Sequence, residues 1–243
     1  MPRYTVDLHN HTPVIPTDYR GEPETTPRQI VETALERGID VWGIADHFTV
    51  EYGERLVAAA AEVARETGRH LLVIPGAEVR VRWEGEEFHL VCLFPPVSPQ
   101  VPFGVLLGML GLPVPAAPLE RLPFLHVDRD PRDVARMVTA LGGVCHIGHV
   151  DRWFGEYCLM ESDFIHEVAE SPYIAALEFI EPTSRAHFRE GLRIACVSSS
   201  DSHSLEEIGR RTSTLEMPEL SFAGLRHALQ VARGEIAGVV AAS

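Results

Sequence analysis

The stretch YTVDLHNHT, residues 4–12, ends a short apolar strand pattern with two histidines that are separated by one residue. Side chains two positions apart in an extended chain point to the same face, so His9 and His11 should lie together beyond the carboxyl end of the strand. Two imidazoles placed in this way can hold one metal ion. The stretch therefore predicts a first strand and a metal site at its end.

Short apolar runs alternate with helical patterns along the rest of the chain. The runs are TVDLH, VWGIAD, LLVIPGAEV, FHLVCLF, VCHIGHV, IAALEFI and LRIACVSSSD. No long polar linker separates these runs, and the chain shows no internal repeat. Strands that alternate with helices predict a parallel, barrel-like α/β sheet in a single domain that covers residues 1–243.

Capping residues mark the expected helices. Thr26 is followed by Pro27 and predicts a helix start, and Gly38 predicts the end of that helix. Asp130 is expected to cap the helix within DPRDVARMVTALGG, and a last helix is expected from Ser221 to Gly234.

The composition excludes several classes of function. The formal net charge is -14, from 35 acidic and 21 basic residues, which disfavours non-specific binding to nucleic acid or to an anionic membrane. The chain contains no lysine. Schiff-base chemistry, a P-loop lysine and a carboxylated-lysine metal bridge are therefore excluded.

Cysteine usage and the apolar segments bear on location. The four cysteines are widely spaced without a CxxC pair and are expected to be core thiols, and the N-terminus shows no export signal, so a cytoplasmic location is expected. The apolar stretch FGVLLGMLGL, residues 103–112, is too short to span a bilayer. It lies in a proline-rich segment, residues 95–123, that is expected to be an insertion on the barrel rim, with plain packing favoured over a lid or a dimer contact.

Side chains that can bind metals follow nearly every predicted strand. They are His9, His11, Asp46, His47, Glu78, His149, Asp201 and His203. The carboxyl ends of parallel barrel strands share one mouth, so these residues should converge although they are far apart in the sequence. Imidazole and carboxylate without thiolate suit Zn, Mn or Fe, and more than four ligands indicate more than one ion.

The motifs DLHNHT, GIADH, PGAE, GGVCHIGHVDR and SSSDSHS, in this order, resemble the signatures of the PHP (polymerase and histidinol phosphatase) family of metal-dependent phosphoesterases. The resemblance runs from residue 7 to residue 204. It implies a distorted (β/α)7 barrel with two or three divalent transition-metal ions at its mouth.

The resemblance also implies a set of ligands. The first ion would be held by His9, His11, Glu78 and Asp201, and Glu78 would bridge to a second ion at His89 and His149. A third ion would use His47 and His203, with Asp18 as the candidate third ligand. The loop TPVIPTDYRGEP that contains Asp18 departs from the family pattern because it is longer and richer in proline.

The chemistry expected of such a cluster is hydrolysis of a phosphoester by a metal-activated hydroxide. Of the two histidines in VCHIGHV, His149 is favoured over His146 as the ligand because it is placed at the mouth. Arg152 and Arg185 follow strands on the same side and are candidates for holding substrate phosphate.

Other functions stay open at this point. The favoured substrate is a small phosphorylated metabolite or nucleotide, and nucleic acid is expected only as a short oligonucleotide substrate. No membrane partner is expected. The alternatives are a TatD-like metal-dependent nuclease, which would not require the DH and DxH pairs, and a non-catalytic, metal-stabilised PHP interaction module, in which ligands are often degraded.

Overall fold

The computed structural model describes residues 1–155, 157–181, 183–184, 188 and 194–232. The strands are β1 (Arg3–Asp7), β2 (Val41–Gly43), β3 (Asp46–His47), β4 (Leu72–Ile74), β5 (Gly76–Trp83), β6 (Glu86–Leu93), β7 (Val127–Asp128), β8 (Val144–Ile147), β9 (Trp153–Phe154), β10 (Tyr157–Cys158), β11 (Ile174–Glu178), β12 (Ala195–Val197) and β13 (Ser213–Glu216). The α-helices are α1 (Pro27–Glu36), α2 (Gly53–Thr67), α3 (Gln100–Met109), α4 (Pro131–Ala140), α5 (Ile165–Ala169) and α7 (Phe222–Ala232). Three short 3-10 helices are η1 (Leu119–Phe124), η2 (Leu159–Glu161) and η3 (Leu205–Glu207).

The strands form two main sheets, and two runs that the sequence predicts as single strands are each split between them. One sheet has the order β13-β1-β2-β4, and the other has the order β12-β11-β8-β6-β5-β3, with β7 also paired to β5. VWGIAD is split between β2 and β3, and LLVIPGAEV is split at Pro75, which has no N–H for a ladder. At Gly76 a Cβ would lie 2.6 Å from the carbonyl oxygen of Cys92 and 2.7 Å from that of Ile44. Only glycine fits where the sheets meet.

The expected parallel arrangement is wrong at β6, which runs antiparallel to both β5 and β8, and β13 is antiparallel to β1. At β6 the cause is a two-residue turn between β5 and β6, in which Glu84 and Gly85 both have positive φ, 52° and 86°. This hairpin pairs Arg80 with His89. Since Glu78 is two residues before Arg80, the hairpin places Glu78 and His89 on one face of the sheet.

The sheets are joined at the carboxyl ends of their parallel strands. An isolated bridge pairs Asn10, just after β1, with Ser202, just after β12. The backbone N–H of Asp201 donates to the carbonyl of His9 at 2.8 Å, and that of Ala45 donates to Asn10 at 2.8 Å. In the described residues the ladders thus form a mixed α/β fold of two joined sheets, and the closed seven-fold barrel stays a prediction.

The predicted helix starts are confirmed. Thr26 accepts a hydrogen bond from the backbone N–H of Gln29 in a capping box with Pro27 in the first turn, and Asp130 caps α4. Gly38 follows α1 with a φ of 74°. The last helix begins at Phe222, next to the expected Ser221, and its expected end at Gly234 lies outside the described residues.

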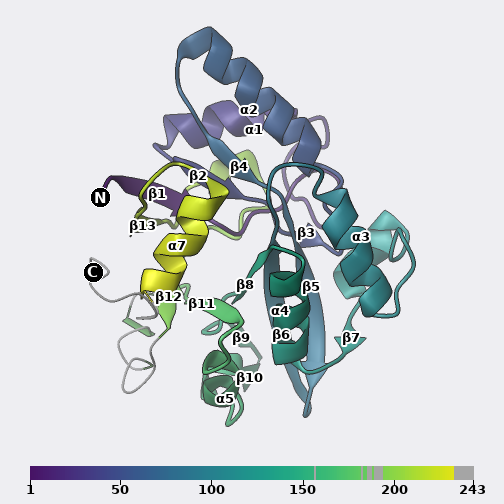
Figure 1. Ribbon diagram of the computed structural model, residues 1–243. Helices are drawn as coiled ribbons and strands as arrows, with labels where there is room; N and C mark the ends of the chain where they lie inside the picture. Colours follow the sequence, from purple (N-terminus) through teal and green to yellow (C-terminus); the bar gives the residue numbers. More distant parts are fainter. Residues whose placement is uncertain (156, 182, 185–187, 189–193, 233–243) are drawn as a thin grey trace.

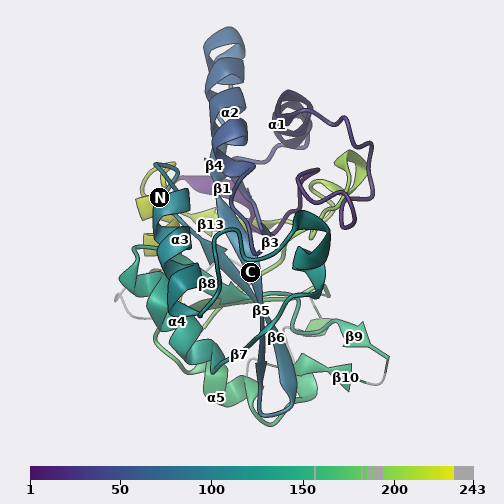
Figure 2. The same cartoon turned by 90° about the vertical axis from the view of Figure 1, so that its right-hand side faces the viewer.

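Helices cover the outer faces of the sheets (Figure 1). α1 and α2 pack together over β2 and β4, and α4 packs over β5, β6 and β8. α7 lies against β11, β12 and β13. Figure 2 shows α2 extending to one end of the molecule and the β9–β10 hairpin lying toward the other.

The proline-rich segment 95–123 contributes both regular structure and core. It contains α3 and most of η1, and α3 lies beside α4 at the edge of the molecule (Figure 1). The four cysteines are free; three are buried and Cys196 is half-buried, as expected of core thiols. Among the described helices, none is both long enough and apolar enough to cross a membrane.

Candidate metal centre

The structure brings all nine predicted ligands together at the joined ends of the sheets. A cavity of about 370 Å³ lies there. It is lined by His11, Asp18, His47, Glu78, His89, His149, Asp201 and His203, together with Arg20, Arg152, Glu207 and Arg210. His9 is fully buried beside it, with Nε2 3.5 Å from Oδ1 of Asp201.

Glu78 is the centre of the cluster and is almost fully buried. Its Oε2 lies 3.6 Å from Nε2 of His9, 3.5 Å from Nε2 of His11 and 3.2 Å from Nδ1 of His47. Its Oε1 lies 2.5 Å from Nδ1 of His89 and 3.4 Å from Nε2 of His149. One carboxylate therefore faces imidazoles that come from three different strand ends and from the middle of β6.

Three groups of side chains have ligand atoms within 4.8 Å of one another. They are His9 with His11 and Asp201, His9 with Glu78 and His149, and His11 with Asp18 and His47. The groups share members, as expected for neighbouring ions with bridging or closely spaced ligands.

Asp18 closes the cluster on the loop side. Its Oδ2 lies 3.0 Å from Nδ1 of His11, and its Oδ1 lies 3.4 Å from Nε2 of His203 and 3.8 Å from Nε2 of His47. The rings of His11 and His203 are stacked with centroids 4.1 Å apart. The proline-rich loop thus places the carboxylate of Asp18 beside His47 and His203, where the third ligand of the third ion was expected.

The histidines of the cluster differ in their affinity for protons. Burial opposes protonation of His9, but the carboxylates of Glu178, Glu78 and Asp201 outweigh it and raise its pKa well above the usual value. Burial likewise opposes protonation of His11, but Asp18 and Asp201 raise its pKa to about 10. Burial lowers the pKa of His47 to about 4. Positive charge is therefore favoured at His9 and His11 and disfavoured at His47.

The atoms of this cluster fit divalent cations. Within the described structure, Nε2 of His9 and Nδ1 of His47 are buried without a hydrogen-bond partner, and each faces Oε2 of Glu78 at 3.6 and 3.2 Å. Two ligand atoms that each lie about 2.1 Å from one tetrahedral ion are roughly 3.4 Å apart. The donor spacing, together with the imidazole and carboxylate chemistry, therefore suits a divalent metal ion.

Glu178 lies in the cluster, and the sequence reasoning missed it. Its Oε1 lies 3.1 Å from Nδ1 of His9 and accepts the backbone N–H of His149 at 3.0 Å. Its other oxygen lies 3.5 Å from Nε2 of the fully buried His146. Glu178 ends β11 and lies two residues before the end of the run IAALEFI, so a strand-end rule applied to this run could have selected it.

The backbone at two of the expected ligands is strained. His149 has a φ of 31° and Asp201 a φ of 48°, in the region that favours glycine. The backbone N–H of His149 donates to the carboxylate of Glu178, and that of Asp201 donates to the carbonyl of His9. Strain of this kind persists where surrounding contacts determine the geometry, as is common at functional sites.

Asp46 has a supporting position, although it stands beside His47 at a strand end. Its carboxylate accepts the backbone N–H and the hydroxyl of Thr12, both at 2.7 Å. Burial raises its pKa to about 7. Asp46 therefore fixes the chain just after His11.

The rim of the cavity is rich in arginine. Arg152, a predicted substrate residue, lies at the cavity and contacts Asp201, whereas Arg185 lies outside the described residues. Arg20 and Arg210, which sequence reasoning missed, both bind Glu207, at 2.9 and 3.0 Å. They lie in loops, where no periodic pattern indicates their direction.

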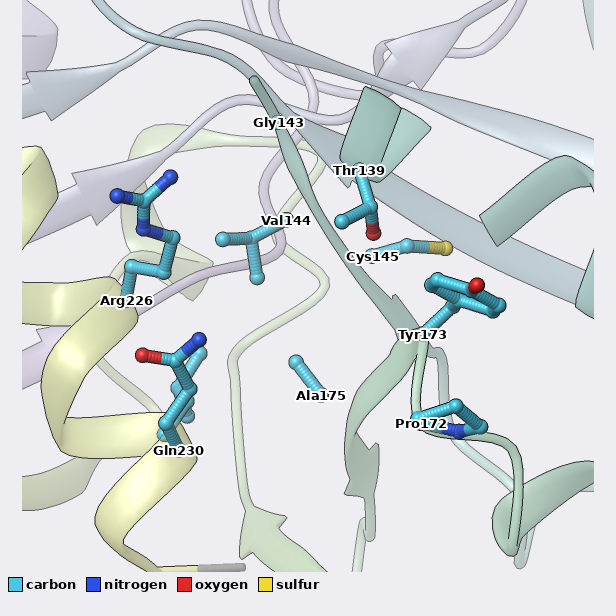
Figure 3. Close-up of a pocket in the computed structure, with 10 residues that line it drawn as sticks. Thr139, Gly143, Val144, Cys145, Pro172, Tyr173, Ala175, Arg226 and Gln230 are labelled. Carbon is cyan, nitrogen blue, oxygen red and sulfur yellow. The ribbon is translucent and has the colours of Figure 1, made fainter. Parts of the chain in front are cut away.

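A second pocket lies at the other ends of the strands and is much smaller, about 60 Å³ (Figure 3). Arg226 and Gln230 from α7 lie on one side of it, and Pro172 and Tyr173 lie on the other. The described residues that line it include no histidine and no carboxylate. This smaller pocket therefore lacks the side chains that a metal site of the kind predicted would need.

Comparison with known sequences gives a short match. No protein-family model matches the chain. It is 33% identical over 87 residues to the 5′-3′ exoribonuclease Rnm of Salmonella typhimurium and to that of Escherichia coli, which is 36% of this chain. The matched region is only 26% of each relative, so the chain matches about a quarter of their length.

Solved structures share the fold over nearly the whole chain. The lesion-specific endonuclease PfuEndoQ from Pyrococcus furiosus has a TM-score of 0.65 at 16% identity and covers 97% of this chain and 57% of its own. A protein assigned as a metal-dependent phosphoesterase from Bifidobacterium adolescentis has a TM-score of 0.60 at 18% identity over 92% of this chain and 95% of its own. An amidohydrolase from Chromobacterium violaceum with bound sulfate has a TM-score of 0.56 at 19% identity over 93% of this chain and 96% of its own. At these identities the likeness establishes the fold alone.

Proposed function

We propose that this chain is a PHP-type, metal-dependent phosphoesterase, a hydrolase built on a distorted (β/α)7 barrel, with residues 1–243 as one domain and 95–123 as a rim insertion. The observation that supports this most is the position of Glu78, a buried carboxylate that faces five imidazoles, those of His9, His11, His47, His89 and His149. An interaction module that had lost catalysis would not need so complete a set.

Two or three divalent ions, Zn, Mn or Fe, would be held by this set. His9, His11 and Asp201 would hold the first, and His89 and His149 the second, with Glu78 between them. Asp18, His47 and His203 would hold the third, and His11 is as near to Asp18 as to Asp201. Bound ions would supply Lewis-acid charge for phosphoryl oxygens and lower the pKa of a water toward neutrality.

The chain's own residues prepare the site for this chemistry. Glu178 holds Nδ1 of His9, so that Nε2 is directed toward Glu78 and Asp201. Arg152 is at the cavity and is 29% exposed, so its guanidinium can exchange Asp201 for a substrate phosphate oxygen. Arg185 stays a second candidate for this role.

The substrate proposed first is a small phosphorylated metabolite or nucleotide, because a cavity of about 370 Å³ and a net charge of -14 suit a small anion better than a long duplex. The likeness to Rnm favours a second candidate, removal of nucleotides from the end of a short RNA. The TatD-like alternative is disfavoured because it does not require Asp46, His47, Asp201 and His203, all of which lie in or beside the cluster. A cytoplasmic location stays a prediction.

A substrate screen tests the proposal. Protein reconstituted with Mn²⁺ or Zn²⁺ is assayed on 4-nitrophenyl phosphate, nucleoside monophosphates, a cyclic dinucleotide, and short DNA and RNA oligonucleotides. Glu78→Gln protein prepared identically is the control. Turnover that needs metal and is lost in the control supports a phosphoesterase. Full metal occupancy with no turnover on any substrate would favour the interaction module.

A further inference from the structure

Helix α3 exposes an apolar stripe that the described part of the chain leaves uncovered. Val101, Val105 and Met109 of α3 are spaced four residues apart and are 68%, 49% and 43% exposed, and Val97, which lies three residues before the helix, is 83% exposed. Four-residue spacing places side chains on one side of a helix. Val114, 69% exposed, lies next to Gly104 of the same helix. These five residues are called the α3 face.

The opposite side of α3 already packs into the core. Phe103, Leu106, Leu107 and Leu110 follow helical spacing and are buried in the main hydrophobic cluster. The helix is therefore apolar on both sides. Such helices are usually buried on all sides, and an exposed contiguous apolar patch marks an interaction surface.

Two glycines border the stripe and allow close approach of another backbone. Gly104 and Gly108 lie one turn apart in α3, and a Cβ added at Gly108 would meet no atom within 4 Å. Glycine in the middle of a helix makes the helix less stable than alanine would. At Gly108 the packing within the chain does not require this destabilising residue. The open position at Gly108, beside exposed valines, is suited to a second helix.

The charge distribution selects the partner. Residues 95–119 contain no charged side chain, in a chain with a net charge of -14. Two copies of such a chain repel each other over most of their surfaces, so apposition is least opposed at an uncharged face. An anionic membrane is repelled by the same charge, and a basic partner would find no acidic group in this segment. We infer that the α3 face is a homodimer interface, in which α3 of one copy packs against α3 of another across a two-fold axis.

The size of the surface agrees with this partner. The five side chains expose several hundred Å², comparable to the apolar part of the roughly 800 Å² that each partner buries in an interface of standard size. A two-fold axis would bring each stripe against the same stripe of its partner. The ridge of one copy can then lie over the glycines of the other.

Sedimentation equilibrium of the full chain between about 1 and 100 µM tests the inference. We expect a mass of about twice 26.9 kDa for the unaltered protein. Val105→Glu buries unpaired charge at the centre of the interface and should weaken dimerisation about tenfold or more. Gly108→Leu should act in the same direction by filling the open space at this position. Ala58→Glu, on the exposed side of α2, adds the same charge elsewhere and should leave the dimer intact.

The outcomes decide between partners. Gly108→Leu removes a glycine from a helix where no neighbour would be displaced, so it keeps its fold even if Val105→Glu does not. A monomer at 100 µM, or a dimer that both α3 variants leave unchanged, would overturn the inference. A monomer that binds phosphatidylcholine vesicles, and loses this binding in Val105→Glu, would replace it with a lipid surface.

Discussion

The metal centre and the α3 face depart in opposite directions from the usual division between a polar surface and an apolar interior. At the centre, Glu78 and Asp201 are almost fully buried and face histidines. On the α3 face, Val97 and Val101 are more than half exposed. Buried charge is costly without a partner of opposite charge, and an exposed apolar patch is costly in contact with water.

Under the two proposals made above, each region is complete only with what binds it. A divalent cation would neutralise the carboxylates of the centre, and a second copy would remove the valines of the α3 face from water. The two regions should therefore respond to different variables. The centre should respond to pH and to chelators, and the α3 face should respond to protein concentration.

Proton competition should give the largest effect, and it concerns the centre alone. In the metal-free protein the surrounding carboxylates outweigh burial and raise the pKa of His11 to about 10, and that of His9 well above its usual value. A raised pKa means that protonation of His11 stabilises the metal-free fold fully below pH 6.5, and that this contribution is lost as pH rises through about 10.

Metal binding should have the opposite pH dependence, because it needs neutral imidazole. Each displaced proton changes the apparent affinity about tenfold per pH unit, so affinity should rise about a thousandfold or more from pH 6 to pH 9. Titration with Mn²⁺ or Zn²⁺ in two buffers of different ionisation enthalpy measures affinity and proton release together. Affinity that does not change over this range would show that His9 and His11 are not ligands.

Glu78→Gln should have the next largest effect. It removes a charge that five imidazoles face, so metal content and turnover should both fall, by about a hundredfold or more in affinity. Glu54→Gln, an exposed carboxylate in the first turn of α2, is the matched control and should change neither. Retention of full metal and activity in Glu78→Gln would remove the bridge from the proposal.

Glu178→Gln tests whether Glu178 orients the metal ligand His9 or is itself a metal ligand. The amide can still accept the N–H of His149 but no longer presents a carboxylate to Nδ1 of His9. We expect metal affinity to fall about tenfold, with the dimer unchanged. Inductively coupled plasma analysis at limiting metal measures this. A loss as large as that of Glu78→Gln would instead make Glu178 a ligand.

Arg152→Ala should have a smaller effect that is seen in kinetics. Arg152 contacts Asp201 at the cavity, so its loss should leave most of the metal in place and raise KM, lower kcat, or both, by about tenfold. Arg152→Lys keeps the charge without the bidentate fork and should recover part of the loss. Unchanged kinetics in Arg152→Ala would exclude it as the phosphate-binding group.

Val105→Glu should have the smallest effect on turnover. Because the α3 face contains no residue of the centre, kcat/KM should change less than about twofold in an assay at concentrations where the dimer has dissociated. A large loss of activity together with normal folding would show that the two regions are coupled.

Much of the centre could be predicted from the sequence because parallel strands bring their carboxyl ends to one place. That rule anticipated the convergence of His9, His47 and Asp201 although they are far apart in the chain. Asp18 was chosen by its place after the first two histidines, and the structure puts its carboxylate 3.0 Å from His11.

Other features depended on contacts that no local pattern records. Glu178 ends β11 and Glu78 is the third residue of β5, and the sequence does not distinguish a ligand from a carboxylate that holds one. Arg20 and Arg210 reach the rim because both bind Glu207. The antiparallel direction of β6 follows from a two-residue turn at Glu84 and Gly85. The prediction of alternating strands and helices did not include this turn.

By itself, the sequence determined the alternation of strands and helices, the helix caps and the identity of the expected ligands, because these depend on short-range periodicity and side-chain chemistry. Tertiary structure alone decided that the strands form two sheets joined at their ends, that Glu78 lies at the centre of the histidines, and that one side of α3 stays exposed. These features depend on which distant segments pack together, and a pattern read along one chain does not specify that choice.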